Sequence, residues 1–143
     1  MPRAPSQLPE EDALMDKSVY NGRMAEEESA RFLERKGYRI VERNYRCRGG
    51  EIDIIAEQRT AGLLKRLAGR DEGFVVFVEV KQRTRSDFGE PREAVNARKQ
   101  ERLRLAAMSW LGEHGSKLQP RFDVIEVKPG ASGPVFNHIE NAF

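Results

Sequence analysis

Residues 50–55 read Gly-Glu-Ile-Asp-Ile-Ile and residues 77–81 read Phe-Val-Glu-Val-Lys, two apolar runs that both carry charge. Side chains alternate across a β-strand, so Glu79 and Lys81 share one face, while Asp53 points away from the isoleucines beside it. Burying an unpaired charge among apolar residues is costly. We therefore expect two neighbouring strands whose charged side chains converge.

Hydrophobic periodicity predicts a helix before these strands and another after them. The first, from Met24 to Lys36, has apolar residues at helical spacing and stops at Gly37. The second runs from about Glu93 to Leu111. Its buried stripe is expected to contain Val95, Leu103, Ala106, Ala107, Trp110 and Leu111. The predicted strands cover residues 38–41, 51–56, 74–81, 122–127 and 135–139. This order of elements predicts an α/β fold, a sandwich around a mixed sheet.

The length of 143 residues suits one domain with a proper core. We expect a flexible N-terminal tail over residues 1–19, which does not resemble a secretory signal, and a single domain over residues 20–143. No apolar run approaches the roughly 20 residues of a membrane helix. The single cysteine, Cys47, suits a reducing compartment, so we expect a cytoplasmic protein. A net charge of only +2 means that any nucleic-acid-binding surface must be local.

Residues 57–73 interrupt the strand pattern between the two charged segments. They include Leu63, Leu64 and Leu67, which suit either a short amphipathic helix or an ordered loop, and the sequence does not decide between them. The segment also carries basic residues, so it is either a DNA-contacting flap or a neutral excursion, with the neutral interpretation favoured.

Paired carboxylates beside a lysine suit metal-assisted hydrolysis of a phosphodiester. The anionic oxygens of a phosphodiester repel hydroxide, and Mg²⁺, typically held by one or two carboxylates and a substrate phosphate, relieves that repulsion. We predict that Asp53, Glu79 and the backbone carbonyl of Val80 are ligands for Mg²⁺, with Mn²⁺ as a substitute. Lys81 is expected to orient the attacking water and to neutralise charge in the transition state.

Further residues are expected around this centre. Glu26 lies beside the buried stripe of the first helix and is predicted to complete the site, whereas Glu27 projects more toward solvent. Glu51 either supports a metal ligand or pairs with a nearby arginine. Contacts with nucleic acid are predicted at Arg46, Arg48, Arg83 and Lys99.

Three interpretations of the charged cluster are open. A Glu-x-Lys sequence at a strand end often forms an ordinary ion pair, which would leave a structural interaction protein. A catalytically inactive nucleic-acid-binding module on a nuclease fold is a second interpretation. Two acidic strands and an inward glutamate on the preceding helix together favour the third, a metal-dependent endonuclease. Endonucleases that cut both strands are often twofold dimers, so a homodimer fits this interpretation.

Several short motifs follow one another along the chain: Gly22-Arg-Met-Ala-Glu26, Asn44-Tyr45-Arg46, Gly49-Gly50-Glu51-Ile52-Asp53, Phe77-Val78-Glu79-Val80-Lys81-Gln82-Arg83 and Arg121-Phe122-Asp123-Val124. In this order they resemble the YraN family of predicted nucleases, within the PD-(D/E)xK superfamily that includes restriction endonucleases and archaeal-type Holliday junction resolvases. The resemblance covers nearly everything from Gly22 to Phe143.

The resemblance implies a restriction-endonuclease-like α/β/α sandwich with a central mixed β-sheet. It places the acidic positions of the site at Glu26, Asp53 and Glu79, and the basic position at Lys81. It also implies DNA as the partner, with branched or structured DNA in repair or recombination among the candidate substrates.

Overall fold

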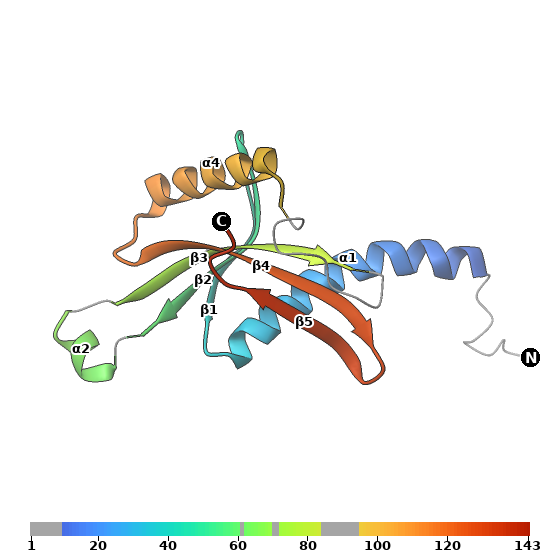
Figure 1. Cartoon of the computed structure of the whole chain (residues 1–143), viewed down its shortest axis with the longest axis horizontal. Helices are drawn as coiled ribbons and strands as arrows, with labels where there is room; N and C mark the ends of the chain where they lie inside the picture. Colours follow the sequence, from blue (N-terminus) through green and yellow to red (C-terminus); the bar gives the residue numbers. More distant parts are fainter. Residues whose placement is uncertain (1–9, 61, 70–71, 84–94) are drawn as a thin grey trace, which may run out of the picture.

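A mixed five-stranded sheet forms the centre of the molecule. Figure 1 shows the computed structural model, which describes residues 10–60, 62–69, 72–83 and 95–143. The strands are β1 (Arg39–Cys47), β2 (Gly50–Arg59), β3 (Gly73–Gln82), β4 (Gln119–Gly130) and β5 (Gly133–Ile139). They are ordered β1-β2-β3-β4-β5. β3 and β4 pair in parallel and the other neighbours are antiparallel, which makes the sheet mixed as predicted.

Two helices cover opposite faces of this sheet (Figure 1), α1 (Glu10–Arg35) on one face and α4 (Ala97–His114) on the other. Under α4 lies a buried cluster that includes Phe77 and Trp110. Under α1 lies a second cluster that includes Leu33 and Val76. The chain therefore has the predicted α/β fold, and its layers are consistent with a restriction-endonuclease-like sandwich.

The central strand β3 separates the two clusters by simple alternation. Val75 and Phe77 pack under α4, whereas Val76 and Val78 pack under α1. All four are buried, because a central strand covered by a helix on each face has no solvated side. By the same alternation, Glu79 and Lys81 at the end of β3 belong to the α4 face.

The helices begin at other residues than predicted. The first helix was expected from Met24, but α1 begins at Glu10, inside the segment predicted as a tail; residues 1–9 of that segment lie outside the described chain. The second helix was expected from about Glu93, a residue outside the described chain; α4 begins at Ala97. The side chain of Asn96 accepts a hydrogen bond from the amide nitrogen of Lys99 at 2.9 Å and so caps this end.

Two further boundaries differ from expectation. The strand predicted over residues 38–41 extends to Cys47, because β1 is an edge strand and solvent tolerates its polar residues. The undecided segment 57–73 contains a short helix, α2 (Leu63–Leu67), with no buried residue. It lies beyond Arg59 and Gly73, at the opposite end of the β2–β3 pair from Ile54 and Val78.

None of the helices in the described part of the chain combines the length and the apolar character that crossing a membrane requires.

Candidate active site

The charged residues of β2 and β3 lie together just beyond the point at which the two strands stop pairing. Their backbone pairing ends at Ile54 and Val78. Beyond that point the amide nitrogen of Val80 donates a hydrogen bond to Oδ2 of Asp53 at 2.8 Å. The Asp53 side chain thus accepts the bond that the backbone of a continuing partner strand would accept.

At Asp53, the side chains of β2 also change the face of the sheet on which they lie. Ile52 packs in the cluster under α4, whereas Ile54, two residues later, packs in the cluster under α1. A regular strand would place both on one face. We call the place where β2 and β3 stop pairing, beyond Ile54 and Val78, the β2–β3 fork. The change at Asp53 lets its side chain lie in this fork rather than inside either cluster.

The carbonyl of Val80 points to the same side as its amide nitrogen, because both groups of one residue face the same neighbour in an extended strand. The amide faces Asp53. Since the β2–β3 pairing has already ended, β2 does not take up this carbonyl. Val80 thus offers an oxygen on the side of the fork where Asp53 lies, as the sequence analysis anticipated.

Glu79 supplies the second carboxylate. Its side chain is only 9% exposed and forms an ion pair with Lys99, whose side chain is 44% exposed. Burial raises the pKa of Asp53 to about 8, and the charge of Glu79 adds to the rise, while the hydrogen bond from Val80 opposes it. The two carboxylates therefore lie close enough for the charge of Glu79 to disfavour ionisation of Asp53.

Glu26 contributes from α1 at longer range. It is half-buried, and its charge is a further, smaller cause of the raised pKa of Asp53. Within the described residues, however, no three histidine, cysteine, aspartate or glutamate side chains are grouped so that they could hold one metal ion. The first helix therefore adds negative potential to the fork without adding a third carboxylate ligand.

Two carboxylates, a carbonyl that β2 does not bind and surrounding negative potential form a donor set that fits a hard divalent cation. Mg²⁺ is usually held by one or two carboxylates, with its remaining positions filled by water and substrate phosphate. The pKa of Asp53 is raised first by burial and then by the charge of Glu79, so positive charge placed beside it would favour its ionised form. A divalent ion at Asp53, Glu79 and the Val80 carbonyl would supply that charge.

Lys81 is half-buried at the end of β3, on the face that carries Glu79. The structure shows no ion pair of Lys81 with any residue that it describes; Glu79 pairs with Lys99 instead. Its nearest neighbour across the sheet in register is Glu126 of β4. Lys81 thus shares a face of β3 with Glu79 and forms no ion pair with it.

A polar groove of about 480 Å³ opens over the site on the α4 side. It is lined by Glu51, Glu79, Asn96, Arg98, Lys99, Arg102 and Leu103. Arg98 and Arg102, one helical turn apart, were not predicted as site residues, although their spacing by four residues on a helix was a usable signal. The groove brings three cations of α4 to the exposed edge of the carboxylate pair.

The other predicted nucleic-acid contacts have different settings. Arg46 is exposed and pairs with Glu51 at 3.5 Å, one of the two roles expected for Glu51. Arg48 is exposed at the turn between β1 and β2. Arg83 donates from Nε to Glu126 at 2.7 Å and is largely buried. Arg46 and Lys99 therefore border or line the groove, and Arg83 does not line it.

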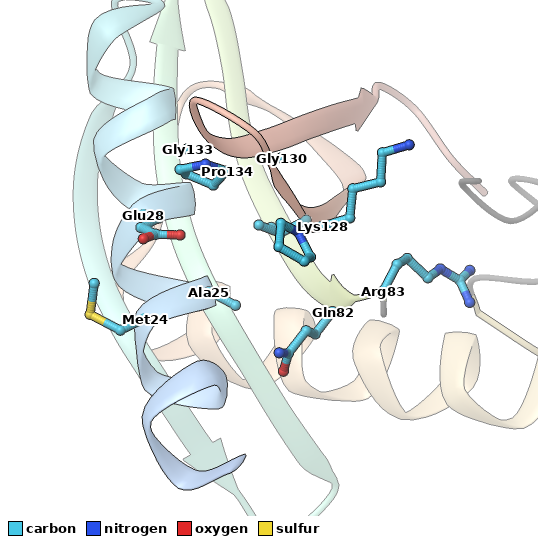
Figure 2. Close-up of a pocket in the computed structure, with 11 residues that line it drawn as sticks. Met24, Ala25, Glu28, Gln82, Arg83, Lys128, Gly130, Gly133 and Pro134 are labelled. Atoms are coloured by element: carbon cyan, nitrogen blue, oxygen red, sulfur yellow. The ribbon is translucent and has the colours of Figure 1, made fainter. Parts of the chain in front are cut away.

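A second pocket, of about 330 Å³, lies between α1 and the β4–β5 hairpin, beside the end of β3 (Figure 2). Met24, Ala25 and Glu28 come from α1, Gln82 is the last residue of β3, and Arg83 follows it. This pocket contains neither carboxylate of the fork. The α4 groove, in contrast, is lined by Glu79 itself.

Comparison with known proteins identifies the family of this chain. Residues 25–127 match the model of the family described as "Uncharacterised protein family UPF0102", a span that includes Glu26, Asp53, Glu79, Lys81 and Lys99. A UPF0102 protein of Geobacter metallireducens is 41% identical over 132 residues, 92% of this chain and 96% of that protein. A UPF0102 protein of Symbiobacterium thermophilum is 45% identical over 124 residues, 85% of this chain and 94% of that protein. The chain therefore belongs to the uncharacterised protein family UPF0102.

Proposed function

We propose that this protein is a divalent-metal-dependent endonuclease that hydrolyses phosphodiester bonds in DNA. The observation that carries the proposal is the convergence of Asp53 and Glu79 at the β2–β3 fork, next to a groove that is lined by Glu79 and by cations of α4. Lys81 lies on the same face of β3 as Glu79 and has no ion-pair partner within the described residues. Asp53, Glu79 and the carbonyl of Val80 would hold Mg²⁺. Bound there, Mg²⁺ supplies a Lewis acid for the phosphoryl oxygen and an activated water.

The side chains of the chain itself have separate tasks. Lys81 holds a proton near the reacting phosphate and donates hydrogen bonds to oxygens on which negative charge develops. Arg98 and Arg102 bind phosphates on either side of the scissile bond, because they line the groove beside Glu79. Glu26 adds negative potential that favours retention of the cation.

Branched or structured DNA is the proposed substrate class, following the resemblance to resolvase-like nucleases. Binding through phosphates does not read base sequence, so discrimination between substrates rests on their shape. DNA as substrate and a single free thiol at Cys47 fit action in the cytoplasm.

The test is cleavage of linear, single-stranded and branched DNA with Mg²⁺ or Mn²⁺ by the wild type and by Asp53→Asn, Glu79→Gln and Lys81→Met. We expect each substitution to lower the rate by at least about 100-fold, as the loss of a charge-stabilising or proton-transferring group does. Glu57→Gln is the matched control. Glu57 also lies on β2, but it pairs with Arg39 and Arg59.

Equal rates in Asp53→Asn and Glu57→Gln would reject the assigned site. Retention of DNA binding by a wild type that cleaves none of the substrates would instead identify an inactive binding module on the same fold.

A further inference from the structure

Lys99 pairs with a carboxylate that the proposed mechanism assigns to a metal ion. We propose that the Lys99 ammonium and a divalent cation compete for Glu79, and that the cation, once bound to Glu79, releases Lys99 into the α4 groove to bind a phosphate of the substrate. The competition requires only a divalent cation. The second step rests on the proposed nuclease function.

The geometry makes Lys99 the mobile partner of this pair. Glu79 is buried in a central strand, with a side chain 9% exposed, while the Lys99 side chain is 44% exposed. The backbone of Lys99 is fixed at the start of α4, because its amide nitrogen donates to Asn96 Oδ1. A flexible four-carbon chain on a fixed backbone can move its ammonium without disturbing the helix.

Charge explains why a divalent cation would displace the lysine. Asp53 and Glu79 carry two potential negative charges, and within the described chain Lys99 is the cation that pairs with Glu79. One ammonium does not compensate both carboxylates. A divalent ion with oxygen ligands engages both at once, so it binds the pair better than a single amine does.

Competition lowers the apparent affinity for metal. If Lys99 occupies Glu79 in nine molecules of ten, the apparent dissociation constant rises about tenfold over the intrinsic value. The same linkage works in reverse, because a phosphate that captures Lys99 frees Glu79 for the cation. Metal and substrate should therefore strengthen each other's binding through this one side chain.

The α4 groove can hold a phosphate within reach of the released Lys99 ammonium. Lys99 lines it together with Arg98 and Arg102, so a phosphate held by the arginines lies within the region that the lysine reaches. Arg98 is also the matched control for the charge of Lys99. It lies one residue earlier on the same helix and lines the same groove, but among the described residues it forms no ion pair with Glu79.

The experiment measures Mn²⁺ binding calorimetrically to the full chain as wild type, Lys99→Met and Arg98→Met, with folding checked by circular dichroism. Removing either cation strengthens metal binding somewhat by long-range electrostatics. We expect Lys99→Met to bind Mn²⁺ about tenfold more tightly than the wild type, and several-fold more tightly than Arg98→Met. Equal affinities in the two variants, or no measurable Mn²⁺ binding in any of them, would overturn the competition.

A second measurement tests the release step through the affinity of a branched DNA with and without Ca²⁺, a hard cation that seeks the same oxygen ligands. In the wild type, Ca²⁺ should strengthen DNA binding by several-fold more than in Lys99→Met. Equal strengthening in both proteins would overturn the release. Tighter Mn²⁺ binding by Lys99→Met in a protein that binds no DNA would support the competition while rejecting the proposed function.

Discussion

At the scale of single residues, Asp53 is the most informative titratable group. It is surrounded by apolar strands and by the charge of Glu79, and these raise its pKa from the ordinary value of 3.8 to about 8. The folded protein therefore keeps a proton on Asp53 between about pH 4 and pH 8, where an unfolded chain has lost it. Folding stability from this group consequently falls as the pH rises through that window.

This sign gives a stability prediction. Asp53→Asn keeps an oxygen that can accept the Val80 hydrogen bond and removes the charge. We expect the difference in the free energy of unfolding, variant minus wild type, to be larger at pH 8 than at pH 5. Urea denaturation at both pH values measures it. Glu57→Gln serves as the comparison, because Glu57 pairs with two arginines; a similar pH trend in both variants would contradict the explanation.

At the scale of elements, the tip of the β1–β2 hairpin packs directly on the backbone of α4. A Cβ atom on Gly50 would lie 2.6 Å from the carbonyl oxygen of Arg102, closer than real contacts allow. Only glycine permits this approach. The approach also brings Glu51 to the groove and holds β2 away from β3 beyond Asp53.

Gly50→Ala should therefore push the hairpin away from α4. We expect it to destabilise the protein by about 1–3 kcal/mol, as overpacking does, and to weaken Mn²⁺ binding because Asp53 lies three residues further along β2. Gly112→Ala is the control, since nothing lies within 4 Å of its Cβ position and alanine is the better helix former. Chemical denaturation together with metal titration gives both readouts. Unchanged stability in Gly50→Ala would contradict the close packing.

The elements also differ in how well local sequence determined them. A continuous apolar run identified β3 almost to its ends, and helical periodicity identified the buried stripe of α4. Helical periodicity missed the starts of α1 and α4. The Asn96 cap decides one start, and α1 continues to Glu10 through residues without a clear apolar stripe. The face change of β2 at Asp53 was also missed, because a local pattern contains no information about strand separation.

At the scale of the whole molecule, a buried polar network lies on the α1 face of the sheet, opposite to the face that carries Glu79. Asp123 of β4 is fully buried and accepts hydrogen bonds from Arg121, His138 and the amide nitrogen of Asn141. Arg121 also donates to Tyr38, so the network links β4, β5 and the chain before β1. Burial alone would raise the pKa of Asp123, but the bonds from His138 and Arg121 hold it below its usual value.

This network should stabilise the fold without taking part in the reaction. Asp123→Ala leaves Arg121 buried without its carboxylate partner, and we expect a loss of about 3–5 kcal/mol in the free energy of unfolding. Arg31→Ala breaks an exposed pair with Glu27 and should change it by less than about 1 kcal/mol. Denaturant titration compares the two. Nuclease activity per folded molecule should be unchanged in both, and a selective loss in Asp123→Ala would mean that the network reaches the site.

His138 illustrates what a residue type alone does not reveal. Its side chain is buried, makes edge-to-face contacts with the rings of Phe32 and Tyr38, and bonds to Asp123 at 2.7 Å. These partners are far from His138 in the chain, so no spacing in the sequence could identify them.

The amino-acid sequence by itself determined the α/β class, the identity of the main strands and the two acidic strands of the site, because alternation and periodicity are local properties of the chain. Tertiary structure alone decided which cation meets Glu79, where β2 leaves β3, and that Arg98 and Arg102 line the groove. These features depend on the register of separate strands and on the height at which α4 packs over Gly50. Such contacts between distant segments leave no periodic trace in the sequence.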